Sequence, residues 1–139
     1  MSVKFAWPVR VYYEDTDAGG VVYHANYLRY MERARNEWLR DMGHPVEQIV
    51  EQERKLFVVR SLEMKFVRPA KLSDELSVSA EVVLVKKASM QLRQEVHRSA
   101  GESDELLVSA IIELAMVDSE RFRPVRLPEF LSSATATQF

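Results

Sequence analysis

Groups that could carry out chemistry on a carbonyl gather in one short segment near the start of the chain. Residues 13–27 read YEDTDAGGVVYHANY, which places three carboxylates before a glycine pair and His24 shortly after it. A carboxylate can act as a general base or as a nucleophile. If a helix begins beside His24, its unpaired N–H groups and the positive end of its dipole would stabilise an oxyanion. The segment therefore suits a reaction at a substrate carbonyl.

Each of these groups also has a purely structural interpretation. An acidic residue before a helix is often a cap or a turn former, and we favour that interpretation for Asp15 but not for Asp17. A glycine pair often only makes a turn, and tyrosines often pack in cores or interfaces. A lone histidine is more often a hydrogen-bonded structural residue than a catalyst. The hypothesis of a reactive site therefore rests on the whole segment.

Other motifs that begin in a similar way are incomplete here. A calcium loop starting at Asp15 lacks ligands at its fifth and twelfth positions, and the aspartate loop of haloacid-dehalogenase phosphatases needs Thr or Val where Gly19 stands. The glycine pair is not followed by the Lys-Ser/Thr of a P-loop, and no G-x-S-x-G nucleophile elbow occurs. His24, Asp17 and Glu14 could hold a metal, but no His-x-x-x-His pair supports them, so we expect no metal site.

Chain length and composition exclude several classes of site and partner. The chain has 139 residues, no cysteine and a formal net charge of −2. The length predicts a single domain over residues 1–139. Without cysteine it can form no disulfide or thiolate site, and its charge argues against a nucleic-acid partner. No apolar run has the length of a signal peptide or a membrane span. We therefore expect a cytoplasmic protein, with attachment to the inner membrane through a partner as an alternative.

An amphipathic helix is predicted directly after the reactive segment. From about Asn26, apolar residues recur at helical spacing with charged residues between them, until Gly43 and Pro45 end the pattern. The helix has about 16 residues and one apolar face. A short second helix is expected from Pro45 to about Glu53, with Pro45 at its first position.

The other segments alternate apolar and polar residues, which is the period of a half-buried strand. The first strand has Val11 and Tyr13 on its apolar face, and Pro8 suits its start or a sheet edge. Four more strands are predicted at about residues 61–66, 76–84, 90–97 and 106–116. The connections are short, including a turn at 99–105, so the strands should pair antiparallel. The end of the chain, from about residue 131, is expected to be a frayed tail.

The order of these elements predicts the architecture. One strand is followed by one long helix and then by four strands. A single amphipathic helix needs a broad apolar partner, and an antiparallel sheet of five strands supplies one. We therefore expect an α+β fold in which the sheet curls around one long central helix.

The segment 13–27, together with Glu32-Arg33-Ala34-Arg35, resembles the signature of the 4-hydroxybenzoyl-CoA thioesterase family of hotdog-fold proteins. Within that family it is most similar to the YbgC type, the acyl-CoA thioesterases associated with the Tol–Pal envelope system. The similarity continues through residues 57–60, 68–70 and 123–128 and covers roughly residues 5–130. The resemblance implies a hotdog fold, which agrees with the order of elements. It also implies a homo-oligomer, a dimer or a homotetramer built as a dimer of dimers, with the active site at a subunit interface.

The resemblance also implies the reaction and the catalytic residues. It predicts hydrolysis of a small or short-chain acyl-CoA to the free acid and coenzyme A, with no cofactor because coenzyme A is part of the substrate. The family's catalytic aspartate corresponds to Asp17, as general base or nucleophile. The amide that polarises the carbonyl corresponds to the backbone N–H of His24, with Tyr23 adjacent. The His24 side chain would then lie near the thioester and orient Asp17, the water or the substrate.

The residues expected to contact the substrate lie around this centre and along the following helix and strands. They are Tyr13, Gly20, Val21, Val22, Tyr27, Glu32, Arg60 and Arg68. Glu32 has an alternative interpretation as a salt-bridge partner of nearby arginines. Arg60 and Arg68 are candidates for the coenzyme A phosphates, with a solvated strand face as the alternative.

A second hypothesis belongs to a different class of function. The protein could act mainly by binding an acyl carrier protein or a component of the envelope complex, with weak or incidental thioesterase activity. The Asp17 segment and the helix beside it favour the enzyme.

Overall fold

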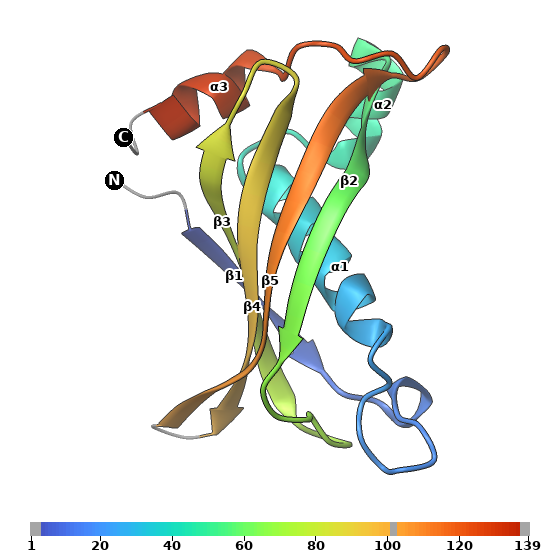
Figure 1. Cartoon of the computed structure of the whole chain (residues 1–139), viewed down its shortest axis with the longest axis vertical. Helices are drawn as coiled ribbons and strands as arrows, with labels where there is room; N and C mark the ends of the chain where they lie inside the picture. Colours follow the sequence, from blue (N-terminus) through green and yellow to red (C-terminus); the bar gives the residue numbers. More distant parts are fainter. Residues whose placement is uncertain (1–3, 101–102, 137–139) are drawn as a thin grey trace.

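The computed structural model describes residues 4–100 and 103–136 and has a five-stranded antiparallel sheet with a long helix against one face (Figure 1). The strand order across the sheet is β1-β3-β4-β5-β2. The strands are β1 (Lys4–Arg10), β2 (Lys55–Phe66), β3 (Glu75–Val85), β4 (Ser89–Ala100) and β5 (Ser103–Asp118). The predicted α+β fold with five antiparallel strands is confirmed.

Strand β1 forms one edge of the sheet and ends earlier than predicted. Pro8 lies inside it, paired with Ser77 of β3, and an edge strand tolerates the missing N–H because one side of it has no partner strand. The prediction continued the strand to Tyr13, but Tyr13 begins a 3-10 turn, η1 (Tyr13–Asp15). The carboxylate of Asp15 accepts the N–H of Tyr12 at 2.9 Å, and this local bond competes with strand pairing.

Strands β4 and β5 are longer than predicted. They pair as far as Ala100 and Ser103, so the flanks of the predicted turn are strand, and its centre, Gly101, lies outside the described residues. The register of this pair shifts near its end. The alternation of residues 106–116 predicts that Leu106 faces the core, but the shift brings Leu107 into the core instead, where it is fully buried.

Helix α1 (Asn26–Asp41) confirms the predicted amphipathic helix. The side chains on its buried face are those of Tyr27, Tyr30, Met31, Ala34, Trp38 and Leu39. Gly43 follows the helix with a φ of +88°, the left-handed conformation expected of a glycine at this place. Helix α2 (Val46–Glu53) is also confirmed, although Pro45 precedes it as an extended N-cap residue. None of the described helices has the length and apolarity needed to cross a membrane.

The end of the chain forms a helix where the sequence suggested a frayed tail. Helix α3 (Glu129–Ala136) begins there, and Leu131 is fully buried. Phe130 stacks on His44, with ring centroids 3.8 Å apart. These apolar contacts hold the helix against the body of the protein, so the prediction of a frayed tail is wrong as far as residue 136. Residues 137–139 lie outside the described part of the chain.

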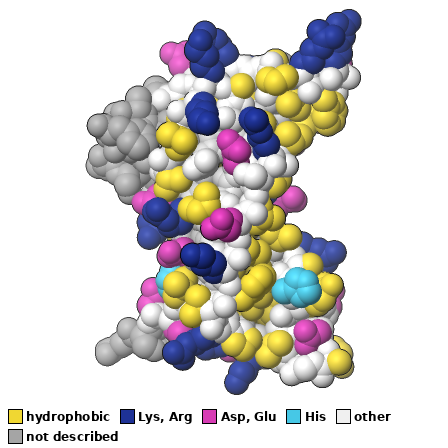
Figure 2. All heavy atoms as spheres, viewed as in Figure 1, with side chains coloured by type: hydrophobic (Ala, Val, Ile, Leu, Met, Phe, Trp, Pro, Cys, Tyr) yellow, Lys and Arg dark blue, Asp and Glu magenta, His cyan; other side chains and the backbone are white. Residues whose placement is uncertain are grey.

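The two exposed regions of the sheet differ in polarity. The face that turns away from α1 carries charges of both signs, including the ion pair Arg93–Glu81 at 3.3 Å, and Figure 2 shows the two signs interspersed. Apolar side chains gather along the β2 side of the molecule (Figure 2). There Val59, Leu62 and Phe66 are 53%, 41% and 54% exposed. Because β2 is the second edge of the sheet, the single chain leaves both its hydrogen-bonding edge and this apolar surface open.

Candidate active site

The loop between η1 and α1 is a tight turn built around Asp17. The Asp17 N–H donates to the Val21 carbonyl at 2.9 Å, and the Gly20 N–H donates to the Asp17 carbonyl at 3.0 Å. Gly20 has a φ of +80°, which favours glycine at this position. One oxygen of the exposed Asp17 carboxylate accepts the Gly19 N–H at 2.8 Å. The turn therefore fixes Asp17 and leaves its other carboxylate oxygen exposed to solvent.

The N-terminus of α1 presents an unpaired backbone N–H at His24. The neighbouring Tyr23 N–H is already used, because it donates to the Asp15 carbonyl at 2.9 Å. The Asn26 N–H donates back to the Tyr23 carbonyl at 2.8 Å, which closes the first turn. Within the described part of the chain, the His24 N–H donates to no protein acceptor. It lies at the positive end of the helix dipole, so it is suited to an oxygen that gains negative charge.

A small pocket lies beside this N–H. It has a volume of about 210 Å³ and is lined by Val22, His24, Tyr27, Phe66, Val67, Arg68 and Pro69. The His24 ring meets the ring of Phe66 edge-on, with centroids 6.4 Å apart, and its centroid lies 4.6 Å from that of the Tyr23 ring. The walls are mostly apolar, with the His24 ring and the Arg68 guanidinium as the polar groups. A small acyl group would fit these walls.

Tyr27 connects α1 to the loop that forms the other wall of this pocket. Its buried hydroxyl accepts the Ala70 N–H at 3.0 Å, and the Ala70 carbonyl accepts the Val22 N–H at 2.9 Å. Burial raises the pKa of the Tyr27 phenol, so it stays neutral. The peptide groups of Ala70 therefore hold together the start of α1, the Asp17 loop and the segment after β2.

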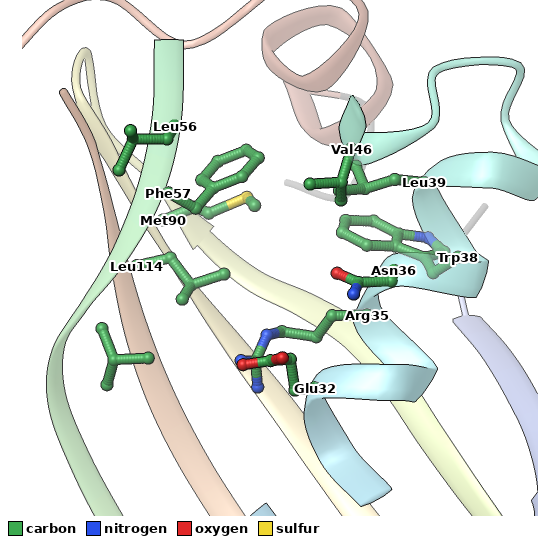
Figure 3. A pocket seen from close by; sticks show the side chains of 11 residues that line it. Glu32, Arg35, Asn36, Trp38, Leu39, Val46, Leu56, Phe57, Met90 and Leu114 are labelled. Carbon is green, nitrogen blue, oxygen red and sulfur yellow. The ribbon is translucent and has the colours of Figure 1, made fainter. Parts of the chain in front are cut away.

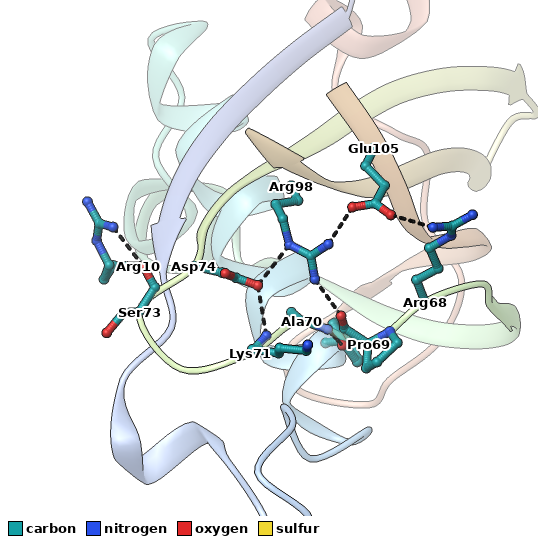
Figure 4. A network of polar contacts seen from close by, with 10 residues as sticks. Arg10, Arg68, Pro69, Ala70, Lys71, Ser73, Asp74, Arg98 and Glu105 are labelled. Atoms are coloured by element: carbon teal, nitrogen blue, oxygen red, sulfur yellow. Dashed lines mark hydrogen bonds and ion pairs between the residues drawn. The ribbon is translucent and has the colours of Figure 1, made fainter. Parts of the chain in front are cut away.

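A network of ion pairs fixes the same loop from the side of β4 (Figure 4). Arg98 donates to the Asp74 carboxylate at 2.9 Å, to the Pro69 carbonyl at 2.6 Å and to the Glu105 carboxylate. The second oxygen of Glu105 accepts Arg68 at 2.9 Å. The hydrogen bond to Asp74, together with the charges of Asp74 and Glu105, raises the pKa of Arg98. This network positions Arg68 at the rim of the pocket.

We expect the Arg98→Met variant to lose about 3 kcal/mol of unfolding free energy, because several charge-assisted hydrogen bonds disappear together and Asp74 and Glu105 each lose one of their partners. Urea unfolding followed by circular dichroism measures the loss. Arg10→Met is the matched control, since Arg10 pairs with Glu75 at the surface, where side chains are about half exposed and pairs contribute less than about 1 kcal/mol. Equal losses in the two variants would show that the network adds no stability.

The structure brings together four of the residues predicted from the sequence. Val22, His24, Tyr27 and Arg68 line the 210 Å³ pocket. Four others, Asp17, Gly20, Val21 and Tyr23, lie in the loop that leads to it but not on its wall. Within one chain the predicted catalytic carboxylate therefore lies on the loop that leads to the pocket and not on the pocket wall.

Three predicted residues lie elsewhere. Tyr13 lines a separate shallow hollow with Arg10 and Leu72. Glu32 lines a second pocket further along α1. Arg60 lies where the β2–β5 register shifts and lines none of the pockets found among the described residues. No group of three or more His, Asp or Glu side chains in the described ranges could hold a metal ion.

Phe66, Val67 and Pro69 line the pocket but are not among the site residues predicted from the sequence. They come from the end of β2 and the segment after it, about 40 residues beyond His24. Phe66 was identified only as an apolar strand residue, and nothing in the alternation distinguishes a strand residue that lines a pocket from one in the core. The proline that stops the strand was the available signal, because loops at strand ends often carry binding residues.

Comparison with known proteins places the chain among thioesterases. Residues 19–105 match the family described as the thioesterase superfamily, 4HBT. Acyl-CoA thioesterase YbgC of Haemophilus influenzae is 42% identical over 130 residues, which cover 94% of this chain and 93% of that protein. A probable thioesterase from Bartonella henselae has a solved structure that covers 90% of this chain and 99% of its own, with 37% identity and a TM-score of 0.83.

A more distant structure shares the fold. 4-Hydroxybenzoyl-CoA thioesterase from Pseudomonas sp. strain CBS-3 superposes with a TM-score of 0.85 at 23% identity, covering 94% of this chain and 98% of that one. The resemblance inferred from residues 13–35 and the prediction of an enzyme that cleaves thioesters are thereby confirmed at the level of the family. The chain belongs to the 4HBT thioesterase superfamily of hotdog-fold proteins, with curated relatives of the YbgC type.

Proposed function

We propose that the protein hydrolyses the thioester of a small or short-chain acyl-CoA, giving the free acid and coenzyme A. The observation that carries this proposal is the unpaired His24 N–H at the positive end of α1, beside a small pocket with mostly apolar walls. Asp17 supplies an exposed carboxylate on the adjoining loop. The relative named acyl-CoA thioesterase, with 42% identity over nearly the whole chain, supports the same substrate class.

In the proposed reaction the carbonyl oxygen of the thioester accepts the His24 N–H, which stabilises the negative charge that forms during attack. As a general base, Asp17 takes a proton from water while the water oxygen adds to the carbonyl carbon. As a nucleophile, an Asp17 oxygen adds to that carbon, and water then hydrolyses the resulting anhydride. On either route the carbon–sulfur bond breaks and the thiolate of coenzyme A leaves. Coenzyme A belongs to the substrate, so we propose no separate cofactor.

The size of the pocket supports a small acyl group. A cavity of roughly 150 Å³ holds benzene, so 210 Å³ corresponds to about eight non-hydrogen atoms. The edge-on contact between His24 and Phe66 closes one side of the space. A longer acyl chain would have to leave this pocket along the surface of β2.

Arg68 is the predicted basic residue best placed for a phosphate of coenzyme A. It lies on the rim of the 210 Å³ pocket and also lines a neighbouring hollow of about 430 Å³, which Lys71 lines as well. Glu105 already holds one edge of the Arg68 guanidinium, and the side chain is 66% exposed, so its other donors are accessible. We assign Arg68 and Lys71 to the phosphates on this basis.

We propose that the open edge strand β2 pairs with the β2 strand of a second copy of the chain. Two copies related by a two-fold axis would pair their β2 strands antiparallel and cover Val59, Leu62 and Phe66. Antiparallel pairing would place the Phe66 end of each β2, beside His24, next to the Lys55 end of the other copy. The site would then be completed by residues of both copies, in agreement with the subunit-interface site that the family resemblance implies.

Turnover of a panel of acyl-CoAs by the purified protein tests the proposed activity. Release of free thiol should be fastest for small acyl groups and should fall once the group exceeds the pocket. A pull-down with acyl carrier protein, performed in parallel, tests the alternative function as a binding partner. Stable capture of the carrier without turnover of any acyl-CoA would favour that alternative and contradict the proposed hydrolysis.

The His24→Ala variant should lose only part of its turnover, by about tenfold. The proposed oxyanion donor is the backbone N–H, which alanine retains, whereas removal of such a donor costs about 10²–10³ in rate. The expected loss reflects the missing imidazole, which orients the substrate or Asp17. Initial rates with the best acyl-CoA measure it, and circular dichroism confirms folding. Complete inactivity of the folded variant would show that the imidazole itself is essential.

A further inference from the structure

A second pocket, distinct from the one beside His24, lies between the middle of α1 and the start of β2 (Figure 3). Its volume is about 250 Å³. Most of its walls are apolar, formed by Trp38, Leu39, Val46, Leu56, Phe57, Val59, Met90 and Leu114. The polar groups, Glu32, Arg35 and Asn36, come from α1 alone. The pocket therefore combines an apolar body with a charged side.

Arg35 is held in this pocket by a buried amide. One of its guanidinium nitrogens donates to the side-chain oxygen of Gln94 at 3.0 Å. Gln94 is fully buried and donates to the carbonyls of Met31 and Ser79 at 3.0 and 3.1 Å. Figure 3 shows the Arg35 side chain extending from α1 into the space between helix and sheet. Its direction is thus set by the core, which leaves its other donors for the pocket.

Arg35 forms no direct ion pair with a carboxylate of the described residues, although Glu32 lies nearby on the same helix. Burial lowers the pKa of its guanidinium, and the nearby Glu32 charge opposes that shift. A partly desolvated cation without a direct ion pair is costly, and an anion that hydrogen-bonds to it would relieve that cost.

We propose that this pocket binds a small carboxylate, with the carboxylate oxygens on the Arg35 guanidinium and the apolar body against Trp38, Phe57 and Met90. A guanidinium presents parallel N–H groups that match a carboxylate. By comparison with the cavity of roughly 150 Å³ that holds benzene, 250 Å³ corresponds to about ten non-hydrogen atoms. A six- to eight-carbon acid or an acid with one ring has this size.

The carboxylate has two chemical sources. It belongs either to a free organic acid or to a dicarboxylic acyl group. In the second case it is the distal carboxylate, and the thioester at the other end of the acyl group lies at the His24 of a paired copy. The second source rests on the proposed function and on antiparallel pairing through β2, and the first rests on neither.

Calorimetry on the full-length protein tests the pocket directly. Hexanoate should bind at least tenfold more tightly than 1-hexanol, since only the acid can form the charge-assisted bonds to Arg35. Arg35→Gln should remove this preference, and Arg35→Lys should keep part of it. Arg29→Gln is the matched control, because Arg29 is exposed on the same helix and lines none of the pockets described. Glu32→Gln should tighten hexanoate binding, since it removes a negative charge near the hexanoate carboxylate without disturbing Gln94.

Turnover of adipoyl-CoA and hexanoyl-CoA distinguishes the two sources. These substrates differ only in the distal carboxylate. If Arg35→Gln lowers kcat/KM for adipoyl-CoA at least tenfold and leaves hexanoyl-CoA within threefold, the carboxylate belongs to the acyl group. If only hexanoate binding depends on Arg35, the ligand is a free acid. If neither hexanoate binding nor the ratio of the two kcat/KM values changes in folded Arg35→Gln, the proposal is overturned. Absence of hydrolysis with both substrates would contradict the proposed function separately, while the hexanoate result would still decide the pocket.

Discussion

The Asp17→Asn variant is expected to lose about 10²–10⁴-fold in turnover, the cost of removing a general base or nucleophile. The asparagine side chain keeps an oxygen that can accept the Gly19 N–H, which Asp17 accepts at 2.8 Å, so the loop should retain its conformation. Coenzyme A binding should persist, because the phosphates are assigned to Arg68 and Lys71. Initial rates with the best acyl-CoA measure the loss, and calorimetry with coenzyme A measures binding.

Asp15→Asn is the control for this prediction. The Asp15 side chain accepts the N–H of Tyr12 at 2.9 Å within η1, and asparagine can make the same bond. We therefore expect the Asp15 variant to remain within about tenfold of the parent protein. If folded Asp17→Asn also stays within tenfold of the parent, Asp17 is not the catalytic carboxylate.

The Leu62→Arg variant should be monomeric, and its turnover should be at least hundredfold lower than that of the parent protein. Leu62 lies on the open edge strand β2, in the centre of the exposed apolar residues proposed to meet a second copy. Two arginines brought together across a two-fold axis would be desolvated and would repel each other. Light scattering should then show particles of 16.1 kDa, the mass of one chain. Turnover should fall because residues of both copies complete the site in the proposed dimer.

Leu84→Arg makes the same chemical change on β3, where Leu84 is exposed but lies away from the β2 edge. This control should keep the oligomer and its activity. A parent protein that is monomeric at micromolar concentration would refute the proposed pairing. A monomeric Leu62→Arg with full turnover would show that one chain holds a complete site.

The sequence predicted the parts of the fold that depend on periodicity. Helix α1 could be predicted because apolar residues repeat at helical spacing between Asn26 and Gly43. The register shift that buries Leu107 could not, because Leu106, Leu107 and Val108 are all apolar and the pattern does not show which of them is the extra residue. Helix α3 was missed because its short sequence carries little amphipathic pattern, and its stability comes from contacts such as the stack of Phe130 on His44.

The candidate site divides in the same way. Asp17 and His24 lie seven residues apart in one segment, so the sequence could indicate them together. The wall supplied by Phe66 and the anchor that Gln94 gives to Arg35 join residues of different elements, and no local pattern records such a meeting. Arg35 was visible only as part of the sequence that resembles the family. Its position in an otherwise mostly apolar pocket required the fold.

A single turnover in ¹⁸O-labelled water, with enzyme in excess over the acyl-CoA, tests whether Asp17 takes part in hydrolysis. We expect the label to enter either the released acid or the Asp17 side chain, as mass spectrometry of the acid and of the digested protein would show. Label in Asp17 identifies a nucleophile whose anhydride is opened at the aspartyl carbon, whereas label confined to the acid is expected when water attacks the acyl carbon, as it does with a general base. Release of coenzyme A with label in neither place, or with label in a residue other than Asp17, would contradict hydrolysis by this site.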